Sequence, residues 1–295
     1  MKRTLILFIA LTGLTACAPP RSSHIVIGAK DFTEQVVLGE LLAQEIEASD
    51  GGPVERRFWL AGSYICQQAL ISNRIDGYVE YTGTAFTAIL KQPLPSPKAR
   101  TPAQIDATIT RLYKQRYHVH VGPGLGFEDT FAMVVRGADA RQFHLRTVSD
   151  IIPYAPKWRL GVGYEFAERP DGLRGLSAAY NLHFSAEPRT MELGLLYRSL
   201  AVHQVDIVAG NSTDGAIRAF DFLALQDDRH YFPPYDAVPL VREDSLERWP
   251  QIGVAMQRLA GKVSAEEMRS MNLAVDAQHR DVAEVVRQFR ASKGL

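Results

Sequence analysis

The chain has 295 residues, and its 33 lysine and arginine residues balance its 33 aspartate and glutamate residues. This balance excludes a global positive field for nucleic acid or for an anionic membrane surface, so specific recognition has to come from a local site. The length allows one large domain or two medium domains with a substantial core.

The first 17 residues have the pattern of a secretory signal. Lys2 and Arg3 precede an apolar run over residues 5–11, and Leu-Thr-Ala-Cys closes the segment at Cys17. The run is too short for a permanent transmembrane helix. The ending resembles the bacterial lipobox, whose cysteine is lipidated and becomes the first residue of the mature chain; the alternative is an ordinary signal peptide. We therefore expect lipidated Cys17 to anchor the protein to a membrane in the periplasm or cell envelope.

The rest of the chain alternates strand and helix patterns. Strands are expected at residues 24–27, 57–60, 77–81, 119–121, 131–135, 160–163, 205–208 and 238–241. Helices are expected over residues 64–72, 83–90, up to about 117, 171–180, 192–203, 255–259, 265–275 and 282–291. An amphipathic helix is also expected from Thr33, with Val36, Leu41 and Ile46 on its apolar face. This order predicts an α/β fold of two lobes with open, mainly parallel sheets, and C-terminal helices that return to the first lobe.

No pattern in the chain is typical of an enzyme or of a bound metal or cofactor. His118 and His120 alternate along a strand without a third ligand nearby, and Asn211-Ser212-Thr213 lacks the second glycine of a nucleophile elbow. Cys66 has no neighbouring base in the segment 63–68, so we expect it to be a buried small side chain. The sequence therefore predicts no catalytic residues, no metal and no cofactor.

Six ordered motifs resemble the substrate-binding proteins of osmoprotectant ABC importers, which take up glycine betaine, choline, carnitine and related quaternary ammonium compounds. The motifs are Gly28-x-Lys30-Asp31-Phe32-Thr33-Glu34-Gln35, Glu80-Tyr81-Thr82-Gly83-Thr84, Gly126-Phe127-Glu128-Asp129-Thr130-Phe131, Tyr164-Glu165-Phe166-x-x-Arg169-Pro170-Asp171-Gly172, Thr213-Asp214-Gly215 and Asp227-Asp228-x-x-x-Phe232-Pro233-Pro234-Tyr235. They run in register from about Ile25 to the C-terminal helices.

This resemblance implies a two-lobed periplasmic-binding-protein fold of type II, which closes over its ligand by hinge motion. Residues 1–17 would be the signal with its lipobox, residues 23–128 and 236–295 would form lobe 1, and residues 129–235 would form lobe 2. The protein would deliver a quaternary ammonium solute to an ABC permease and its ATPase, with contact to the membrane through the lipid anchor only and no contact with nucleic acid. The alternative is the same fold with another trimethylated zwitterion, such as a betaine of histidine, or a cationic amine as its ligand.

The family resemblance also implies which residues would hold the oxygen-bearing end of the ligand. Lys30, the Thr84 hydroxyl and Arg169 would meet a ligand carboxylate, which needs cationic donors and a helix N-terminus. From composition alone the alternatives are a solvated Lys30 and a structural ion pair of Arg169 with Asp171 or Glu165.

The trimethylammonium end would lie in a box of aromatic faces, because a quaternary ammonium has no hydrogen-bond donors. The resemblance assigns Tyr81, Phe131 and Tyr235 to this box, with a carbonyl or carboxylate at Asp129, although Tyr81 could simply pack on its sheet. Phe131 and Asn211 stand where many family members have tyrosine. We expect Asn211 to open one wall of the box, which other tyrosines could rebuild: Tyr64, Tyr78 or Tyr164. We expect Asp214, by contrast, to cap the helix that starts at Gly215.

Overall fold

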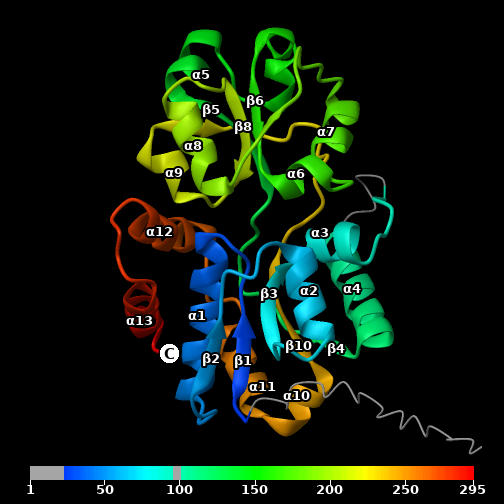
Figure 1. Ribbon diagram of the computed structural model, residues 1–295, viewed down its shortest axis with the longest axis vertical. Coiled ribbons are helices and arrows are strands. Elements are labelled where there is room, and N and C mark those ends of the chain that lie inside the picture. The colour runs from blue at the N-terminus through cyan, green and yellow to red at the C-terminus, as the bar shows by residue number, and fades with distance from the viewer. Residues whose placement is uncertain (1–22, 96–100) are drawn as a thin grey trace, which may run out of the picture.

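The computed structural model describes residues 23–95 and 101–295, and it has two α/β lobes that lie one above the other in Figure 1. Cys17 and the signal segment lie outside the described residues. One sheet has the strand order β2-β1-β3-β10-β4, and the other has the order β7-β6-β8-β5-β9. The chain therefore crosses from the first lobe to the second between β4 and β5, and it returns between β9 and β10. The lobe boundaries at 128/129 and 235/236 stay a prediction.

The first lobe contains both ends of the described chain. Its strands are β1 (Ile25–Gly28), β2 (Val54–Arg57), β3 (Gly77–Tyr81), β4 (Val119–Val121) and β10 (Ala237–Arg242). Its helices are α1 (Thr33–Ala48), α2 (Ser63–Ile71), α3 (Thr82–Thr84), α4 (Pro102–Tyr117), α10 (Glu243–Arg248), α11 (Gln251–Leu259), α12 (Ala265–Asp276) and α13 (Val282–Lys293).

The second lobe is built from the middle of the chain. Its strands are β5 (Phe131–Arg136), β6 (Leu160–Val162), β7 (Arg189–Thr190), β8 (Ile207–Asn211) and β9 (Phe222–Ala224). Its α-helices are α5 (Gly137–Phe143), α6 (Tyr164–Glu168), α7 (Leu173–Tyr180), α8 (Leu193–Ala201) and α9 (Gly215–Ala219), and short 3-10 turns cover Val148–Ile151 and Ala155–Lys157.

The sheets are mainly parallel, as predicted, because in each sheet only one strand runs against the other four. In the first lobe β1 pairs parallel with β2 and β3, whereas β10 pairs antiparallel with β3 and β4. In the second lobe β6 pairs parallel with β7 and β8, whereas β5 pairs antiparallel with β8 and β9. The antiparallel strands β5 and β10 are the first strands after each crossing between lobes. Because each of them enters its sheet from the other lobe, it runs against the strands of the βα units.

Helix α1 is buried on nearly all sides, in place of the amphipathic helix predicted. All residues from Glu34 to Ile46 are buried, because α11, α12 and α13 pack around the helix on the side away from its sheet. Burial of charge on such a helix requires partners. Glu45 is fully buried and forms ion pairs with Arg258 at 2.8 Å and Arg290 at 2.9 Å. These pairs join α1 to the C-terminal helices.

Two local departures from the predicted elements shape the region between the lobes. The second strand ends at Arg57, so residues 58–62 form a loop in which Trp59 and Ala61 have φ values of 63° and 64°. The helix expected over residues 83–90 is α3 followed by a π-helical turn, Ala85–Ile89. Such π-turns often occur at functional sites. Here the turn carries Thr87, whose hydroxyl donates to Asp171 of the second lobe at 2.8 Å.

Helices α9 and α12 pack against each other across the two lobes (Figure 1). A Cβ atom on Gly215, the first residue of α9, would lie 2.5 Å from the backbone nitrogen of Leu273 in α12. Arg218 of α9 also pairs with Glu266 of α12 at 2.9 Å. The absence of a side chain at Gly215 thus permits the close approach of the lobes.

We predict that Gly215→Ala separates the lobes at this contact, since overpacking against backbone costs about 1–3 kcal/mol. Small-angle X-ray scattering should give a larger radius of gyration for the variant than for the wild type. Gly253→Ala is the matched control, because the nearest atom to its added Cβ would be 3.9 Å away. Equal radii for the two variants would show that the α9–α12 contact does not set the distance between the lobes.

Candidate functional site

A cavity of about 740 Å³ lies between the two lobes. Its lining includes all eight residues predicted for the ligand site, which are Lys30, Tyr81, Thr84, Asp129, Phe131, Arg169, Asn211 and Tyr235. Several of them stand at the ends of strands: Lys30 follows β1, Tyr81 ends β3 and Asn211 ends β8. The topology therefore gathers residues that are far apart in the sequence at one place, as is usual for ligand sites of open α/β sheets.

Lys30 is buried and paired, so the alternative of a solvated lysine is wrong. Its side chain is 2% exposed and forms an ion pair with Glu80, which is fully buried. The Glu80 carboxylate also accepts hydrogen bonds from the Tyr81 backbone N–H at 2.8 Å and from the Tyr78 hydroxyl at 3.3 Å. The Lys30 ammonium lies 4.8 Å from the centroid of the Tyr81 ring. One aromatic face of the site thus already contacts a cation.

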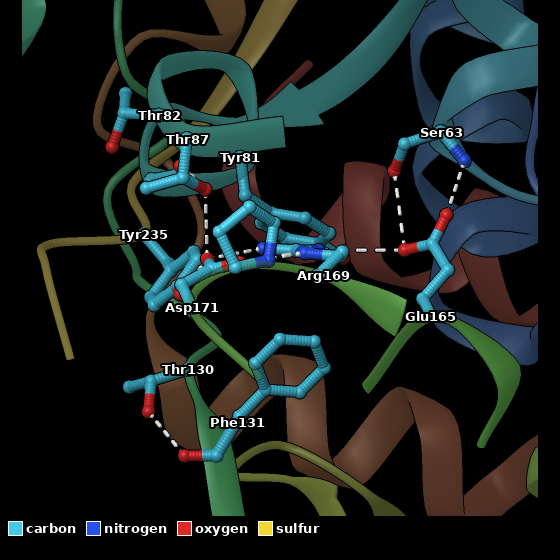
Figure 2. Close-up of polar contacts among 12 residues, drawn as sticks. Ser63, Tyr81, Thr82, Thr87, Thr130, Phe131, Glu165, Arg169, Asp171 and Tyr235 are labelled. Carbon is cyan, nitrogen blue, oxygen red and sulfur yellow. Dashed lines mark hydrogen bonds and ion pairs between the residues drawn. The ribbon is translucent and has the colours of Figure 1, made fainter. Parts of the chain in front are cut away.

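Arg169 is fixed by carboxylates of its own lobe (Figure 2). Its Nε and Nη2 atoms donate to Oδ1 and Oδ2 of Asp171 at 3.0 and 2.6 Å, and its Nη1 lies 3.4 Å from Oε2 of Glu165. Asp171 also accepts from the Tyr235 hydroxyl at 2.5 Å and from Thr87 of the first lobe. The structural ion pairs considered from the sequence are therefore both present, and Arg169 still faces the cavity.

The rings of Phe131 and Tyr235 lie beside the guanidinium of Arg169. The distance from its Cζ atom is 4.6 Å to the Phe131 centroid and 5.9 Å to the Tyr235 centroid. Phe131 meets Phe166 edge-on with the ring centroids 4.9 Å apart, which extends the aromatic wall. Burial raises the pKa of Tyr235 well above its usual value, so its hydroxyl stays protonated and donates to Asp171.

Glu165 makes a second bond between the lobes at the cavity wall. Its Oε1 accepts from the backbone N–H of Ser63, the first residue of α2, at 2.6 Å (Figure 2). Burial acts to raise the pKa of Glu165, but Lys30, Arg169 and the Ser63 bonds outweigh it and hold the pKa below its usual range. A Cβ atom on Gly62 would lie 2.2 Å from Oε1, so only glycine leaves room for this carboxylate.

Three acidic side chains gather at another part of the cavity. The hydrogen bonds that they accept come from uncharged groups. Glu34 accepts from the hydroxyls of Tyr81 and Thr213, both at 2.6 Å, and from the Asn272 amide at 2.9 Å. Because Thr213 belongs to the second lobe, this carboxylate also bridges the lobes. Burial, aided by the nearby Asp214 charge, raises the pKa of Glu34 to about 7.

Asp129 and Asp214 complete this acidic cluster. Asp129 accepts from the hydroxyl of Ser212 at 3.1 Å and from the backbone N–H of Thr213 at 3.2 Å. Burial, with the charges of Glu34 and Asp214, raises the pKa of Asp129 well above its usual value. Burial also raises the pKa of Asp214 to about 6. The cluster gives this wall a negative potential that strengthens as pH rises.

The prediction that the side chain of Asp214 caps helix α9 is wrong. Asp214 is the N-cap residue of α9, but its side chain makes no capping hydrogen bond. Its carboxylate instead accepts from the Tyr197 hydroxyl at 2.5 Å and from the backbone N–H of Asn211 at 2.8 Å. These bonds hold it in the wall of the cavity, beside Asn211.

The aromatic lining differs from the substitutes proposed from the sequence. Tyr164 lines the cavity and is exposed at its edge, whereas Tyr64 and Tyr78 do not line it. Phe166, which occurs in one of the quoted motifs, also lines the cavity, as does Tyr197, which the sequence analysis did not name. The sequence analysis also gave no ligand-site role to five polar residues that organise the site, namely Glu34, Glu165, Asp171, Thr213 and Asn272. The first four occur within the quoted motifs, and this was the only sign of their role in the sequence. Asn272 lies outside the motifs, and nothing in the sequence pointed to it.

The described part of the chain was also searched for a metal site and for a membrane-spanning helix, and the state of Cys66 can be read from it. Residues 23–95 and 101–295 contain no group of three or more His, Cys, Asp or Glu side chains that could hold a metal ion. In the same residues, no helix is both long and apolar enough to cross a bilayer. Cys66 is fully buried, and burial raises the pKa of its thiol to about 12.

The two lobes, with a cavity at the ends of their strands, define the class of two-lobed solute-binding proteins. Within this class, the family model for the substrate binding domain of ABC-type glycine betaine transport systems matches residues 23–292. The chain belongs to this family. Its members are the binding proteins of ABC transporters, and these binding proteins work outside the cytoplasm.

Individual relatives agree with this assignment. The chain is 30% identical over 285 residues to the carnitine transport binding protein of Listeria monocytogenes, covering 96% of this chain and 91% of that protein. It is 29% identical over 273 residues to the ergothioneine transport permease/ergothioneine binding protein of Helicobacter pylori, covering 92% of this chain and 48% of that protein. A crystal structure of a glycine betaine/carnitine/choline ABC transporter matches with a TM-score of 0.76 and 29% identity, over 92% of this chain and 98% of that one.

We predict that a cationic ligand binds more tightly as pH rises from about 6 to 8. Glu34 has a pKa of about 7 and Asp214 one of about 6, so at pH 6 Glu34 is largely protonated and Asp214 about half protonated, whereas at pH 8 both are ionised. Ionised carboxylates attract the cation, and by linkage the bound cation lowers their pKa values. Titration of the protein with choline across this pH range measures the effect.

The Glu34→Gln variant tests how much of this pH dependence of the affinity comes from Glu34. Its amide oxygen keeps an acceptor for one of the two hydroxyls, of Tyr81 or Thr213, but the side chain cannot ionise, so the rise in affinity above about pH 6.5 should flatten. A wild-type affinity that stays constant or falls as pH rises would contradict the prediction.

Proposed function

We propose that this protein captures a quaternary ammonium compatible solute of the glycine betaine, choline or carnitine type between its lobes and passes it, chemically unchanged, to the permease and ATPase of an ABC importer. The observation that carries the proposal is that one cavity between the lobes is lined by all eight residues that the family motifs assign to the ligand. Family membership over residues 23–292 supports the same conclusion.

The cationic end of the ligand is held by the aromatic faces and the acidic cluster. The rings of Tyr81, Phe131 and Tyr235 each have a cation within 6 Å of the centroid in the structure, so these faces suit positive charge. Asp129 stands near Glu34 and adds negative potential. A trimethylammonium group cannot donate hydrogen bonds, and it is stabilised by both features without any strict geometry.

The other end of the ligand faces Lys30, Thr84 and Arg169. Both cations are buried, and Thr84 is 2% exposed at the start of the turn that also carries Thr87. These three side chains suit an oxygen atom of the ligand. Asn211 also lines the cavity, where its amide can form a hydrogen bond with a larger ligand. This feature favours the second candidate, a larger trimethylated compound or a cationic amine held in the same cavity.

We predict that Tyr81→Leu weakens choline binding by up to about 30-fold, since a desolvated cation–π contact contributes roughly 2 kcal/mol. Tyr81→Phe keeps the ring and loses only the hydroxyl bond to Glu34, so its affinity should fall less. Calorimetry with choline and with 3,3-dimethylbutan-1-ol, its uncharged carbon isostere, separates charge from shape. Equal losses in Tyr81→Leu and Tyr81→Phe would exclude the ring as a cation site.

The lipid anchor is also part of the proposal. We predict that Cys17→Ser abolishes metabolic labelling of the protein with palmitate and releases it from the membrane fraction of the cell. Cys66→Ser should retain the label, because Cys66 is buried in the folded domain and its thiol has a raised pKa. Label that persists in Cys17→Ser would show that residues 1–17 act as an ordinary signal peptide.

A further inference from the structure

We propose that Trp59, at the mouth of the cavity, contacts a planar side group of the ligand, and that Tyr164 of the second lobe completes this contact. The inference rests on the proposed function and specifies the class of solute. That class is a trimethylated compound with a flat, unsaturated side group, such as the betaine of an aromatic amino acid. Trp59 lies outside the six sequence motifs, and its backbone conformation, position and exposure carry the inference.

Trp59 has a backbone conformation that is unfavourable for its side chain. Its φ is 63°, and the φ of Ala61, two residues later, is 64°. Of the twelve non-glycine residues with positive φ in the described part of the chain, nine are Asn, Asp or His, which tolerate this region best. A bulky side chain at positive φ is strained. Such strain is found at ligand clamps and switch regions, where the surrounding structure imposes it.

The segment of residues 58–62 is held in this conformation by the residues that follow β1. The backbone N–H of Leu60 donates to the carbonyl of Ala29 at 3.0 Å, and the backbone N–H of Asp31 donates to the carbonyl of Ala61 at 3.1 Å. These bonds fix the backbone on both sides of position 59. The indole ring therefore extends from a rigid base, next to the segment that supplies the lysine of the site.

Trp59 and Tyr164 come from opposite lobes and both line the cavity. The backbone N–H of Ser63, the first residue of α2, donates to Glu165 of α6 at 2.6 Å (Figure 2). Trp59 is four residues before Ser63, and Tyr164 is one residue before Glu165. The contact between the lobes thus brings the two aromatic residues to the same edge of the cavity.

Both rings keep open faces at this edge. Trp59 is 63% exposed and Tyr164 is 60% exposed, although both residues line the cavity. In the described part of the chain, neither ring stacks on another aromatic ring. Exposed apolar surface is unfavourable in water. A ligand group that lies against the rings removes their faces from water and contributes to affinity.

The shape of the aromatic rings favours a planar ligand group at the mouth. In the proposed function, the charged ends of the solute have their places deeper in the cavity, so the mouth is left for a side group. Aromatic rings prefer offset-stacked or edge-to-face contacts with other flat, unsaturated groups. The cavity of about 740 Å³ has the size of sites that hold ligands larger than glycine betaine, roughly 300–1,000 Å³.

The test uses betaines that share the trimethylammonium group and the carboxylate and differ only in the side group. Calorimetric titration of the purified protein compares glycine betaine with the N-trimethylated forms of leucine and phenylalanine. We expect the phenylalanine betaine to bind about 3- to 10-fold more tightly than the leucine betaine, the effect of one aromatic pair beyond the area it buries. Equal affinities of these two compounds would overturn the inference and leave the proposed function intact.

Trp59→Asn tests the residue itself. Asparagine removes the ring and tolerates positive φ, so the ratio of the two affinities should fall by about 3- to 10-fold. The melting temperature should rise by roughly 2–4 °C as the strain is relieved, which separates the loss of the ring from a loss of folding. Tyr64→Asn is the matched control, because Tyr64 is an exposed aromatic residue of α2 that does not line the cavity. Equal ratios in the two variants would overturn the role of Trp59.

Tryptophan fluorescence measures the contact directly. The chain has three tryptophans, so the emission that is lost in Trp59→Asn is that of Trp59. We expect the phenylalanine betaine to shift this emission to shorter wavelength and to protect it from quenching by acrylamide, with a smaller effect of glycine betaine. Equal protection by the two compounds would show that closure of the lobes alone covers the indole, and it would overturn the contact with the side group.

The remaining outcomes separate the inference from the function beneath it. If neither choline nor any of the three betaines binds to the folded wild-type protein, the proposed function fails, and the contact with a planar group fails with it. If glycine betaine binds and the phenylalanine betaine does not, the function stands and the inference is wrong.

Discussion

The carboxylate of Asp171 connects the parts of this protein that have to act together. It holds Arg169 in the second lobe by two bonds, accepts from Tyr235 on the chain that returns to the first lobe, and accepts from Thr87 in the first lobe itself. A fully buried carboxylate is costly unless its charge and its oxygen atoms are satisfied. Because the donors come from three segments, Asp171 is fully satisfied only when those segments meet. The position of the Arg169 guanidinium in the cavity wall therefore depends on the closure of the lobes.

The contacts that join the two lobes at the cavity are polar. Glu34 bonds to Thr213, Glu165 bonds to Ser63 and Asp171 bonds to Thr87 across the cleft. Polar groups that separate can bond to water, so each such contact contributes only about 0.5–3 kcal/mol to the closed state. An apolar interface of the same size would resist opening more strongly. This arrangement lets the protein open to exchange its ligand, and the ligand contributes to the free energy of closure.

The sequence predicted the local elements of this fold better than their long-range relations. The limits of the strands at Gly77–Tyr81 and Val119–Val121 are as predicted, because apolar alternation and flanking glycine or polar residues define them locally. The direction of β5 and β10 was missed, since nothing in a strand's own residues says that it enters its sheet from another lobe. The burial of α1 was also missed, because its charged residue Glu45 is compensated by Arg258 and Arg290, more than 200 residues away.

The same distinction holds for the site. The family motifs predicted which side chains come together at the cavity, and all eight of them line it. They did not predict the charge state of the site, which depends on partners that the motifs do not pair. Lys30 and Glu80 are 50 residues apart in the sequence, and Ser63 and Glu165 are 102 apart. Electrostatic balance is a property of the assembled cavity, so only coordinates reveal it.

Selectivity in this cavity has to arise at the end of the ligand that differs between compatible solutes. Choline and glycine betaine carry the same trimethylammonium group, so in our proposal the rings of Phe131 and Tyr235 and the acidic cluster attract both. Specificity is a difference between two affinities, and it can be set by what a site repels as well as by what it attracts. Lys30 and Arg169 are each paired with carboxylates of the protein itself, namely Glu80, Glu165 and Asp171. The residues that keep the two cations buried therefore also set the charge at that end of the cavity.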